Sequence, residues 1–254
     1  MTFPALSTLT FGDSFNQSLD HTDLPKSLQC LTFGAGFNQT LARACIPATL
    51  VKLCLGANFN RPLDEICIPR LESLTLGSSF NRPLATSFGE SLPNLKDLTF
   101  GLRFNQSLVE VNFPHSLRTL TFGEEYQQPL DNVQLPEELY SITFGLRFNQ
   151  ALRHLPRGLK HLTFGIHFNQ SLLGLTFPDL ESLTFGATFN QSMEGVRLPS
   201  SLRSLAFGQA FKQDLEHLRL PCLETLIFKN NYHLKELLSP VTHFKSQLVE
   251  VSFR

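Results

Sequence analysis

Residues 28–47 read LQCLTFGAGFNQTLARACIP, and versions of this stretch recur along the whole chain of 254 residues. The first Leu of each copy lies at Leu6, Leu28, Leu50, Leu71, Leu95, Leu117, Leu139, Leu159, Leu180, Leu202, Leu223 and Leu248. Successive copies begin 20 to 25 residues apart. A period in this range, with this Leu spacing, is typical of leucine-rich repeats, in which each copy supplies one strand to a continuous parallel sheet. The sequence therefore predicts a solenoid.

Each copy contains a short strand whose two faces follow from the alternation of residue types. Leu31 and Phe33 lie two residues apart, so they point to one face, whereas Cys30 and Thr32 point to the other. The Gly that follows, Gly34 in this copy, marks the corner at which the strand ends. A Gly at such a corner suits either a positive φ or a close approach between coils.

A second aromatic residue, usually followed by Asn, comes four residues after the strand Phe. Trp is absent and Phe occurs 24 times, so we expect spines of Phe side chains along the stack. Asn side chains stacked about 4.8 Å apart can satisfy backbone groups of a corner in their own coil and in the next. We therefore expect a structural asparagine ladder made of Asn16, Asn38, Asn60, Asn81, Asn105, Asn149, Asn169 and Asn190.

The backs of the coils are marked by proline. An apolar residue precedes Pro in nearly every copy, as in Ile46-Pro47 and Leu135-Pro136. Because Pro lacks an N–H and favours extended geometry in the residue before it, we expect extended or 3₁₀ backs with little room for α-helix. The sequence thus predicts an all-β solenoid: an LRR-like, right-handed stack of about 12 coils with one continuous parallel sheet, forming a single domain over residues 1–254.

The combination LTFGxxFNQxL followed by LPxSL resembles the FNIP repeat, a leucine-rich-repeat relative, and the resemblance extends over essentially the whole chain. The fourth residue of the FN-x-Pro motif is Pro only at Pro62, Pro83 and Pro129, and an exposed turn should tolerate the substitutes. The resemblance implies no enzymatic activity for the array itself. Some members of the family attach the array to an F-box or kinase domain, and neither fits within this sequence.

The two ends of the array depart from the repeat. Lys229 replaces the corner Gly of the eleventh copy, and residues 229–254 read as a divergent C-terminal cap. We expect this cap to contain a short helix over 233–238 and a last strand with Leu248, Val251 and Phe253. The N-terminus offers only residues 1–4 as protection for the first coil. Because uncapped repeat arrays expose strand edges and core, we expect either end-to-end self-association or an additional upstream segment.

Composition excludes several functions. Lys and Arg number 21 against 22 Asp and Glu, so bulk charge recruits neither nucleic acid nor an anionic membrane. We find neither a signal sequence nor an apolar run long enough for membrane insertion, and we expect a cytoplasmic protein. No nucleotide or metal motif occurs, so we expect no cofactor and no enzyme. His161 shares a column with Ser141 and Ser182, but the nearest acid in that column, Asp97, is three coils away, too far for a catalytic triad.

Five cysteines occur without the spacing of a zinc site. Cys45 and Cys67 share a repeat phase one coil apart, so a disulfide is geometrically open to them, although a reducing cytosol would keep both thiols free.

Function should therefore lie on outward-facing columns, and two are candidates for an interface with a protein partner. One is a Thr column on the sheet, which includes Thr99, Thr121, Thr143 and Thr163. The other is a charged edge at the corners after Gly, formed by Arg103, Glu124, Glu125, Arg147 and His167. We expect a non-enzymatic scaffold for protein interactions on one of these surfaces. The alternative is binding of a repetitive ligand, ice or a glycan, by the Thr column.

Overall fold

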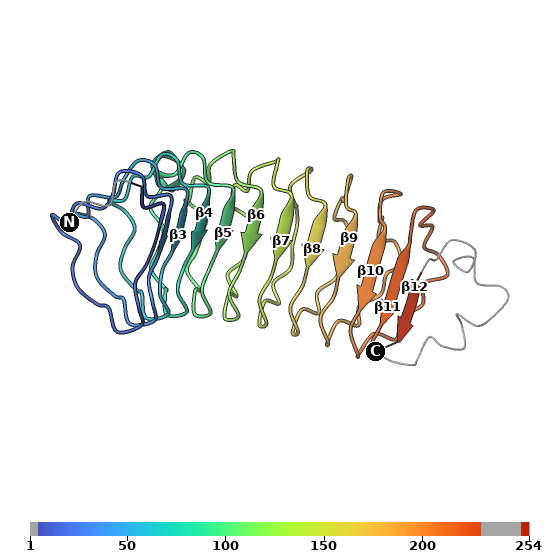
Figure 1. Cartoon of the computed structure of the whole chain (residues 1–254). Coiled ribbons are helices and arrows are strands. Elements are labelled where there is room, and N and C mark those ends of the chain that lie inside the picture. Colours follow the sequence, from blue (N-terminus) through green and yellow to red (C-terminus); the bar gives the residue numbers. More distant parts are fainter. Residues whose placement is uncertain (1–4, 230–249, 254) are drawn as a thin grey trace.

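The computed structural model describes residues 5–229 and the strand at 250–253, and it forms a curved row of stacked coils (Figure 1). Each coil contributes one strand to a 12-stranded sheet whose spatial order is the order along the chain. The strands are β1 (Thr8–Thr10), β2 (Cys30–Thr32), β3 (Lys52–Cys54), β4 (Ser73–Thr75), β5 (Asp97–Thr99), β6 (Thr119–Thr121), β7 (Ser141–Thr143), β8 (His161–Thr163), β9 (Ser182–Thr184), β10 (Ser204–Phe207), β11 (Thr225–Phe228) and β12 (Glu250–Phe253). The predicted parallel solenoid is confirmed.

Pairing between strands is parallel and keeps equivalent repeat positions side by side. Leu98 of β5 lies opposite Leu120 of β6, which lies opposite Ile142 of β7. All three side chains are completely buried. The alternation read from the sequence therefore fixes the register, since a slip by one residue would turn this apolar column to solvent.

Two columns of aromatic rings fill the core beside the sheet. Within a coil the strand aromatic stacks on the second aromatic, as in Phe164 and Phe168, whose ring centroids are 3.7 Å apart. Between coils the rings repeat at a longer distance, for example 6.2 Å from Phe148 to Phe168. These are the predicted Phe spines. Leu55 and Leu76 replace Phe in the strand column, and both are buried.

The corner glycines are explained by close contact between coils. A Cβ atom on Gly56 would lie 1.7 Å from the carbonyl oxygen of Gly34, and one on Gly123 would lie 1.7 Å from that of Gly101. Positive φ angles occur at Gly174 and Gly195 and not at these corners. Of the two reasons that the sequence left open, close approach is therefore the one that applies.

The backs of the coils consist of turns and extended segments, and residues 5–229 contain no 3₁₀ helix. The fourth copy is an exception, because its back carries a short helix, α1 (Phe88–Ser91). This copy is 24 residues long, from Leu71 to the residue before Leu95, and Phe88 of the helix is buried. The sequence did not predict this helix. The expected helix at 233–238 lies outside the described residues, whereas the expected last strand is present as β12.

Candidate interaction surface

The Asn that recurs after the second aromatic forms a ladder of side-chain to backbone hydrogen bonds. The Oδ1 atom of Asn149 accepts a bond of 2.8 Å from the backbone N–H of Asn169, and Asn169 accepts one of 2.9 Å from Asn190. Equivalent bonds join Asn16 to Asn38, Asn38 to Asn60, Asn60 to Asn81, Asn81 to Asn105, Asn105 to Gln127 and Asn190 to Lys212. The Oδ1 atoms of these amides therefore hold consecutive coils together, and this gives the ladder a structural role.

In most coils the residue after the ladder position strengthens the same ladder, a role that sequence reasoning missed. The Nε2 group of Gln106 donates to Oδ1 of Asn81 over 2.9 Å, so one Asn oxygen accepts two bonds from the next coil. Arg61 replaces Gln in the third copy, and its Nε group donates to the carbonyl oxygen of Asn38 over 2.9 Å. The recurrence of Gln directly after Asn was the signal that could have revealed this role.

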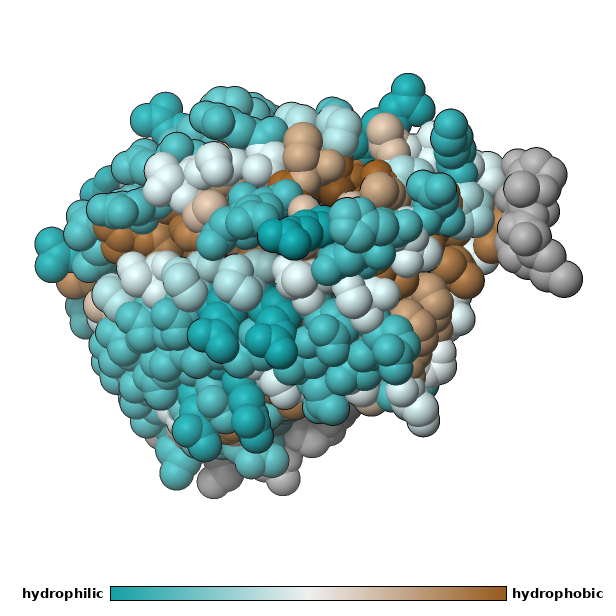
Figure 2. Space-filling view, turned by 90° about the vertical axis from the view of Figure 1, so that its left-hand side faces the viewer, coloured by the Kyte–Doolittle hydropathy of each residue, from teal (hydrophilic) through white to brown (hydrophobic). Residues whose placement is uncertain are grey.

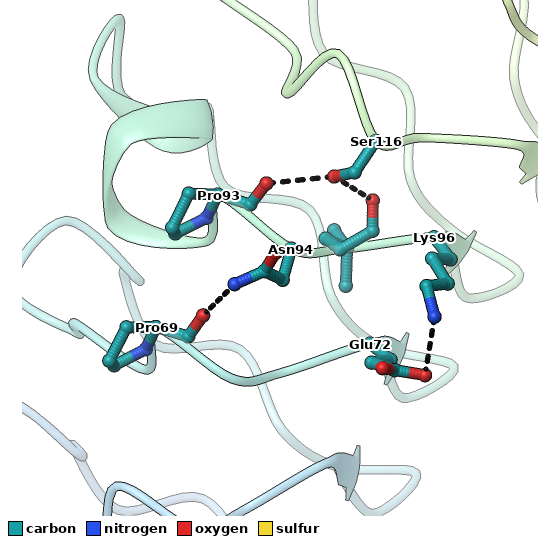
Figure 3. Close-up of polar contacts among 7 residues, drawn as sticks. Pro69, Glu72, Pro93, Asn94, Lys96 and Ser116 are labelled. Atoms are coloured by element: carbon teal, nitrogen blue, oxygen red, sulfur yellow. Dashed lines mark hydrogen bonds and ion pairs between the residues drawn. The ribbon is translucent and has the colours of Figure 1, made fainter.

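A second ladder lies where the chain enters each strand, and Figure 3 shows one section of it. The hydroxyl group of Ser116 donates to the carbonyl oxygens of Pro93 and Leu95, at 2.9 and 2.8 Å. Asn94 donates through Nδ2 to the carbonyl oxygen of Pro69 over 2.6 Å. The Ser of the LPxSL motif thus also connects coils, and this removes another repeated polar residue from the list of binding candidates.

The Thr column occupies the outward face of the sheet. Thr99, Thr121, Thr143 and Thr163 lie opposite one another in consecutive strands. All four are half-buried rather than fully exposed. Cross-strand Thr neighbours stabilise a sheet by themselves, so the column has a structural role that requires no ligand.

The charged edge is more exposed. The side chains of Arg103, Glu124, Glu125, Arg147 and His167 follow one another along consecutive corners, and all five residues are exposed. Backbone bonds fix the spacing, as in the bond of 2.9 Å from the N–H of Arg147 to the carbonyl oxygen of Glu124.

Apolar side chains lie among these charges. Leu102 precedes Arg103 and is 44% exposed, and Ile166 precedes His167 and is 43% exposed. The ion pairs recorded within residues 5–229 lie elsewhere, at Lys96–Glu72, Arg153–Asp131, Lys160–Glu181 and Arg203–Glu224. The charged groups of the edge are thus turned to solvent rather than to one another. Exposed Arg next to apolar groups is a combination found at the anchors of protein interfaces.

A third exposed group, at the starts of β7 and β8, was not predicted. Tyr140 is 42% exposed, and its hydroxyl group lies 3.0 Å from Nε2 of His161. A depression of about 620 Å³ adjoins it, lined in part by Arg118, Glu138 and Lys160. The residue directly before the strand is charged in most copies, and the aromatic Tyr140 at that position was the signal for this site.

Lys160 forms an ion pair of 2.6 Å with Glu181 at this depression. The hydrogen bond to Glu181, with its charge, raises the pKa of Lys160, and Lys160 in turn lowers the pKa of Glu181. Both groups are therefore charged near neutral pH, which suits them to polar recognition rather than to proton transfer.

His161 lies beside Ser141 and Ser182 in the register, as expected from the sequence. Its Nε2 atom lies 3.0 Å from the hydroxyl group of Tyr140, so the ring contacts a phenol there and not a carboxylate. Cys45 and Cys67 are exposed free thiols.

Within the described residues, no helix has the length and apolar character needed to cross a membrane.

Taken together, the parallel strands, the corner glycines and the inter-coil ladders define an LRR-like β-solenoid. The sequence model described as FNIP Repeat matches residues 4–36, 37–78, 89–125, 104–147, 148–188 and 189–231, and the chain belongs to the FNIP repeat family. None of the curated proteins matches the chain.

Among solved structures, the chain is similar to that reported as "The crystal structure of CroV588 a novel circular LRR protein structure". The two share 34% sequence identity with a TM-score of 0.78, over 97% of this chain and 40% of CroV588. This chain thus corresponds to less than half the length of that protein. A leucine-rich repeat protein from Bacteroides ovatus aligns with 11% sequence identity and a TM-score of 0.28. The alignment covers 96% of this chain and 75% of the Bacteroides ovatus protein.

Proposed function

We propose that this protein is a non-enzymatic scaffold that binds a polypeptide partner through the charged edge of coils 5 to 8. One observation carries the proposal: the edge combines exposed apolar side chains, Leu102 and Ile166, with exposed Arg103, Arg147 and His167. The repeated Asn, Gln and Ser side chains of the two ladders already hold coils together. The LRR-like fold supports this function, because solenoids present long, rigid surfaces to other proteins.

Affinity capture from the source cells, read by mass spectrometry, tests the edge against the sheet. The double variant Arg103→Glu/Arg147→Glu reverses charge at the edge, and Thr121→Lys/Thr143→Lys adds bulk and charge to the neighbouring sheet face. We expect a specific partner to be lost with the Arg variant and retained with the Thr variant, because interfaces concentrate their energy in a few anchors.

Circular dichroism of both variants must show an unchanged fold, since these side chains are exposed or half-buried. Retention of the same partners by both variants would reject the edge and the sheet alike. Loss with the Thr variant alone would move the interface onto the sheet.

The alternative proposal is a repetitive ligand, ice or a glycan, bound by the Thr column. Its support is the unbroken register from Thr99 to Thr163. The half-burial of these residues and the presence of Asp97 and His161 in the neighbouring column make the surface less flat and less uniform. Thermal hysteresis in solution, abolished by Thr121→Lys/Thr143→Lys, would favour this alternative.

We also propose that the chain associates end to end. The support is the sheet order, in which β1 and β12 are the outer strands of the part that the structure describes.

A further inference from the structure

The depression beside Tyr140 lies outside the charged edge, near the starts of β6 to β9 in the middle of the stack (Figure 1). Six of its eight lining residues are charged, and Tyr140 is its aromatic member. The surface at the first coil differs, because Figure 2 shows there a brown band of hydrophobic side chains between hydrophilic ones. The lining of the depression therefore favours an occupant with charged and hydrogen-bonding groups rather than an apolar one.

Arg118, directly before β6, is a cation whose counterparts in other coils are paired. Three ion pairs join neighbouring coils through this position: Lys96–Glu72, Lys160–Glu181 and Arg203–Glu224. Arg118 is exposed, and the ion pairs recorded within residues 5–229 do not include it. Its Nη1 group donates to the carbonyl oxygens of His115 and Leu117, at 3.0 and 3.3 Å. These bonds hold the guanidinium group at the depression, while its Nε and Nη2 groups have no acceptor among the described residues.

Tyr140 is held in position at the same depression. Its ring packs edge-on against His161, with centroids 4.9 Å apart and an interplanar angle of 63°, and its hydroxyl group lies 3.0 Å from Nε2 of that residue. Even so, 42% of Tyr140 is exposed. A fixed aromatic side chain loses little conformational entropy on binding, which is one reason why Tyr is frequent at the energetic centres of interfaces.

The other charges of the depression balance one another. Lys160 is bound to Glu181, and Oε2 of Glu137 accepts a bond of 3.1 Å from the backbone N–H of Arg157. Apart from Arg118, the lining has two cationic residues, Arg157 and Lys160, and three acidic ones, Glu137, Glu138 and Asp179. Such a balance does not attract a polyanion such as nucleic acid. It leaves a place for a single carboxylate, at Arg118.

We propose that the depression binds an extended polypeptide segment of about four residues, with one acidic side chain on Arg118 and an adjacent side chain on Tyr140. Arg118 precedes β6 and Asp179 precedes β9, so the lining extends over three strand spacings of about 4.8 Å, or about 14 Å. An extended chain advances about 3.3 Å per residue, so about four residues cover this length. A carboxylate can accept two parallel bonds from a guanidinium group, and Nε and Nη2 of Arg118 supply the donors. This second binding site does not rest on the proposed function of the charged edge.

An array of immobilised tetrapeptides, blocked at both ends, tests the site with the full chain. Each peptide position is Asp, Asn, Lys, Leu or Gly in turn, and fluorescence anisotropy then gives the dissociation constants of the peptides that bind most strongly. Arg118→Gln removes the charge, Arg118→Glu reverses it, and Tyr140→Ala removes the ring. Arg203→Gln is the matched control, because Arg203 has the same repeat position but lies outside the depression, paired with Glu224.

We expect wild type to prefer Asp over Asn at one peptide position, and Arg118→Gln and Tyr140→Ala to weaken binding of the best peptide by about tenfold. Arg118→Glu should prefer Lys at that position, which a merely structural role of Arg118 would not produce. Arg203→Gln should bind like wild type, and circular dichroism should be unchanged in every variant.

Equal binding of Asp and Asn peptides, or the same preference for Asp in wild type and Arg118→Gln, would overturn the proposal. Succinate that binds as tightly as the best peptide would overturn the polypeptide as the occupant, since the contacts of the segment beyond its carboxylate would then add nothing. The variant Arg103→Glu/Arg147→Glu should keep peptide binding, so this proposal and that of the charged edge fail separately.

Discussion

Tyr126 occupies a Phe position in the second aromatic column, and its ring stacks on Phe104 and Phe148 at 6.0 and 6.1 Å. Its hydroxyl group is buried and has no hydrogen-bond partner among the described residues. An unsatisfied buried hydroxyl costs about 1 to 3 kcal/mol. We therefore expect Tyr126→Phe to stabilise the protein by up to this amount in chemical denaturation at neutral pH. Tyr140→Phe is the matched control, because that hydroxyl is exposed and bonded to His161.

The pH dependence of the free energy of unfolding, compared between wild type and Tyr126→Phe, is a second measurement of the same substitution. Burial raises the pKa of the Tyr126 hydroxyl well above its usual value. Below about pH 10 the group is neutral in both states. Above that pH the unfolded chain loses the proton while the folded chain keeps it, so stability falls. The advantage of Tyr126→Phe over wild type should grow above that pH, and a constant difference would contradict the burial of the hydroxyl.

Asn169 shows what one rung of the asparagine ladder contributes. Its Oδ1 atom accepts bonds from the N–H of Asn190 and from Nε2 of Gln191, at 2.9 and 3.2 Å. Asn169→Ala leaves a half-buried N–H of the next coil without its partner, so we expect a loss of about 1 to 3 kcal/mol in chemical denaturation. Asn169→Asp retains the acceptor and should lose less. Equal losses for both substitutions would show that the oxygen is not the group that matters.

At the scale of the element, the strands were predictable and the irregular backs were not. Leu120 and Phe122 alternate with Thr119 and Thr121 in a pattern that every copy repeats, so one strand predicts all the others. Helix α1 arises from the longer fourth copy and from contacts with the next coil, such as the bond of 2.8 Å from the N–H of Gly89 to the carbonyl oxygen of Asn112. The repeat pattern does not predict a contact of this kind.

The candidate surfaces, too, include a part that the sequence predicts and a part that it does not. The row from Arg103 to His167 follows from repeat phase alone, and the structure places these residues on consecutive exposed corners. The depression beside Tyr140 is lined by residues of three successive coils, among them Arg118, Glu138 and Lys160. Side-chain columns can be counted along a periodic sequence, whereas a hollow shared by three particular coils follows only from their three-dimensional packing.

At the scale of the whole molecule, each coil contacts only its neighbours, so stability should behave as a sum of coils and interfaces between adjacent coils. Gly123→Val tests this organisation in the middle of the stack. Its new Cβ would lie 1.7 Å from the carbonyl oxygen of Gly101, so the interface between the coils that contain β5 and β6 must open. We expect the cooperative unfolding of the array to weaken and its denaturation midpoint to fall, because one interface no longer couples the two halves.

Hydrogen exchange shows where the coupling is lost. Backbone amides around β5 and β6 should exchange faster in Gly123→Val, whereas those of coils at a distance, such as β2 and β9, should keep most of their protection. Gly12→Val is the matched control, since its Cβ meets no atom of the described chain within 4 Å and should leave exchange within the stack unchanged. A uniform loss of protection from β1 to β11 in Gly123→Val would instead mean that the array unfolds as one indivisible unit.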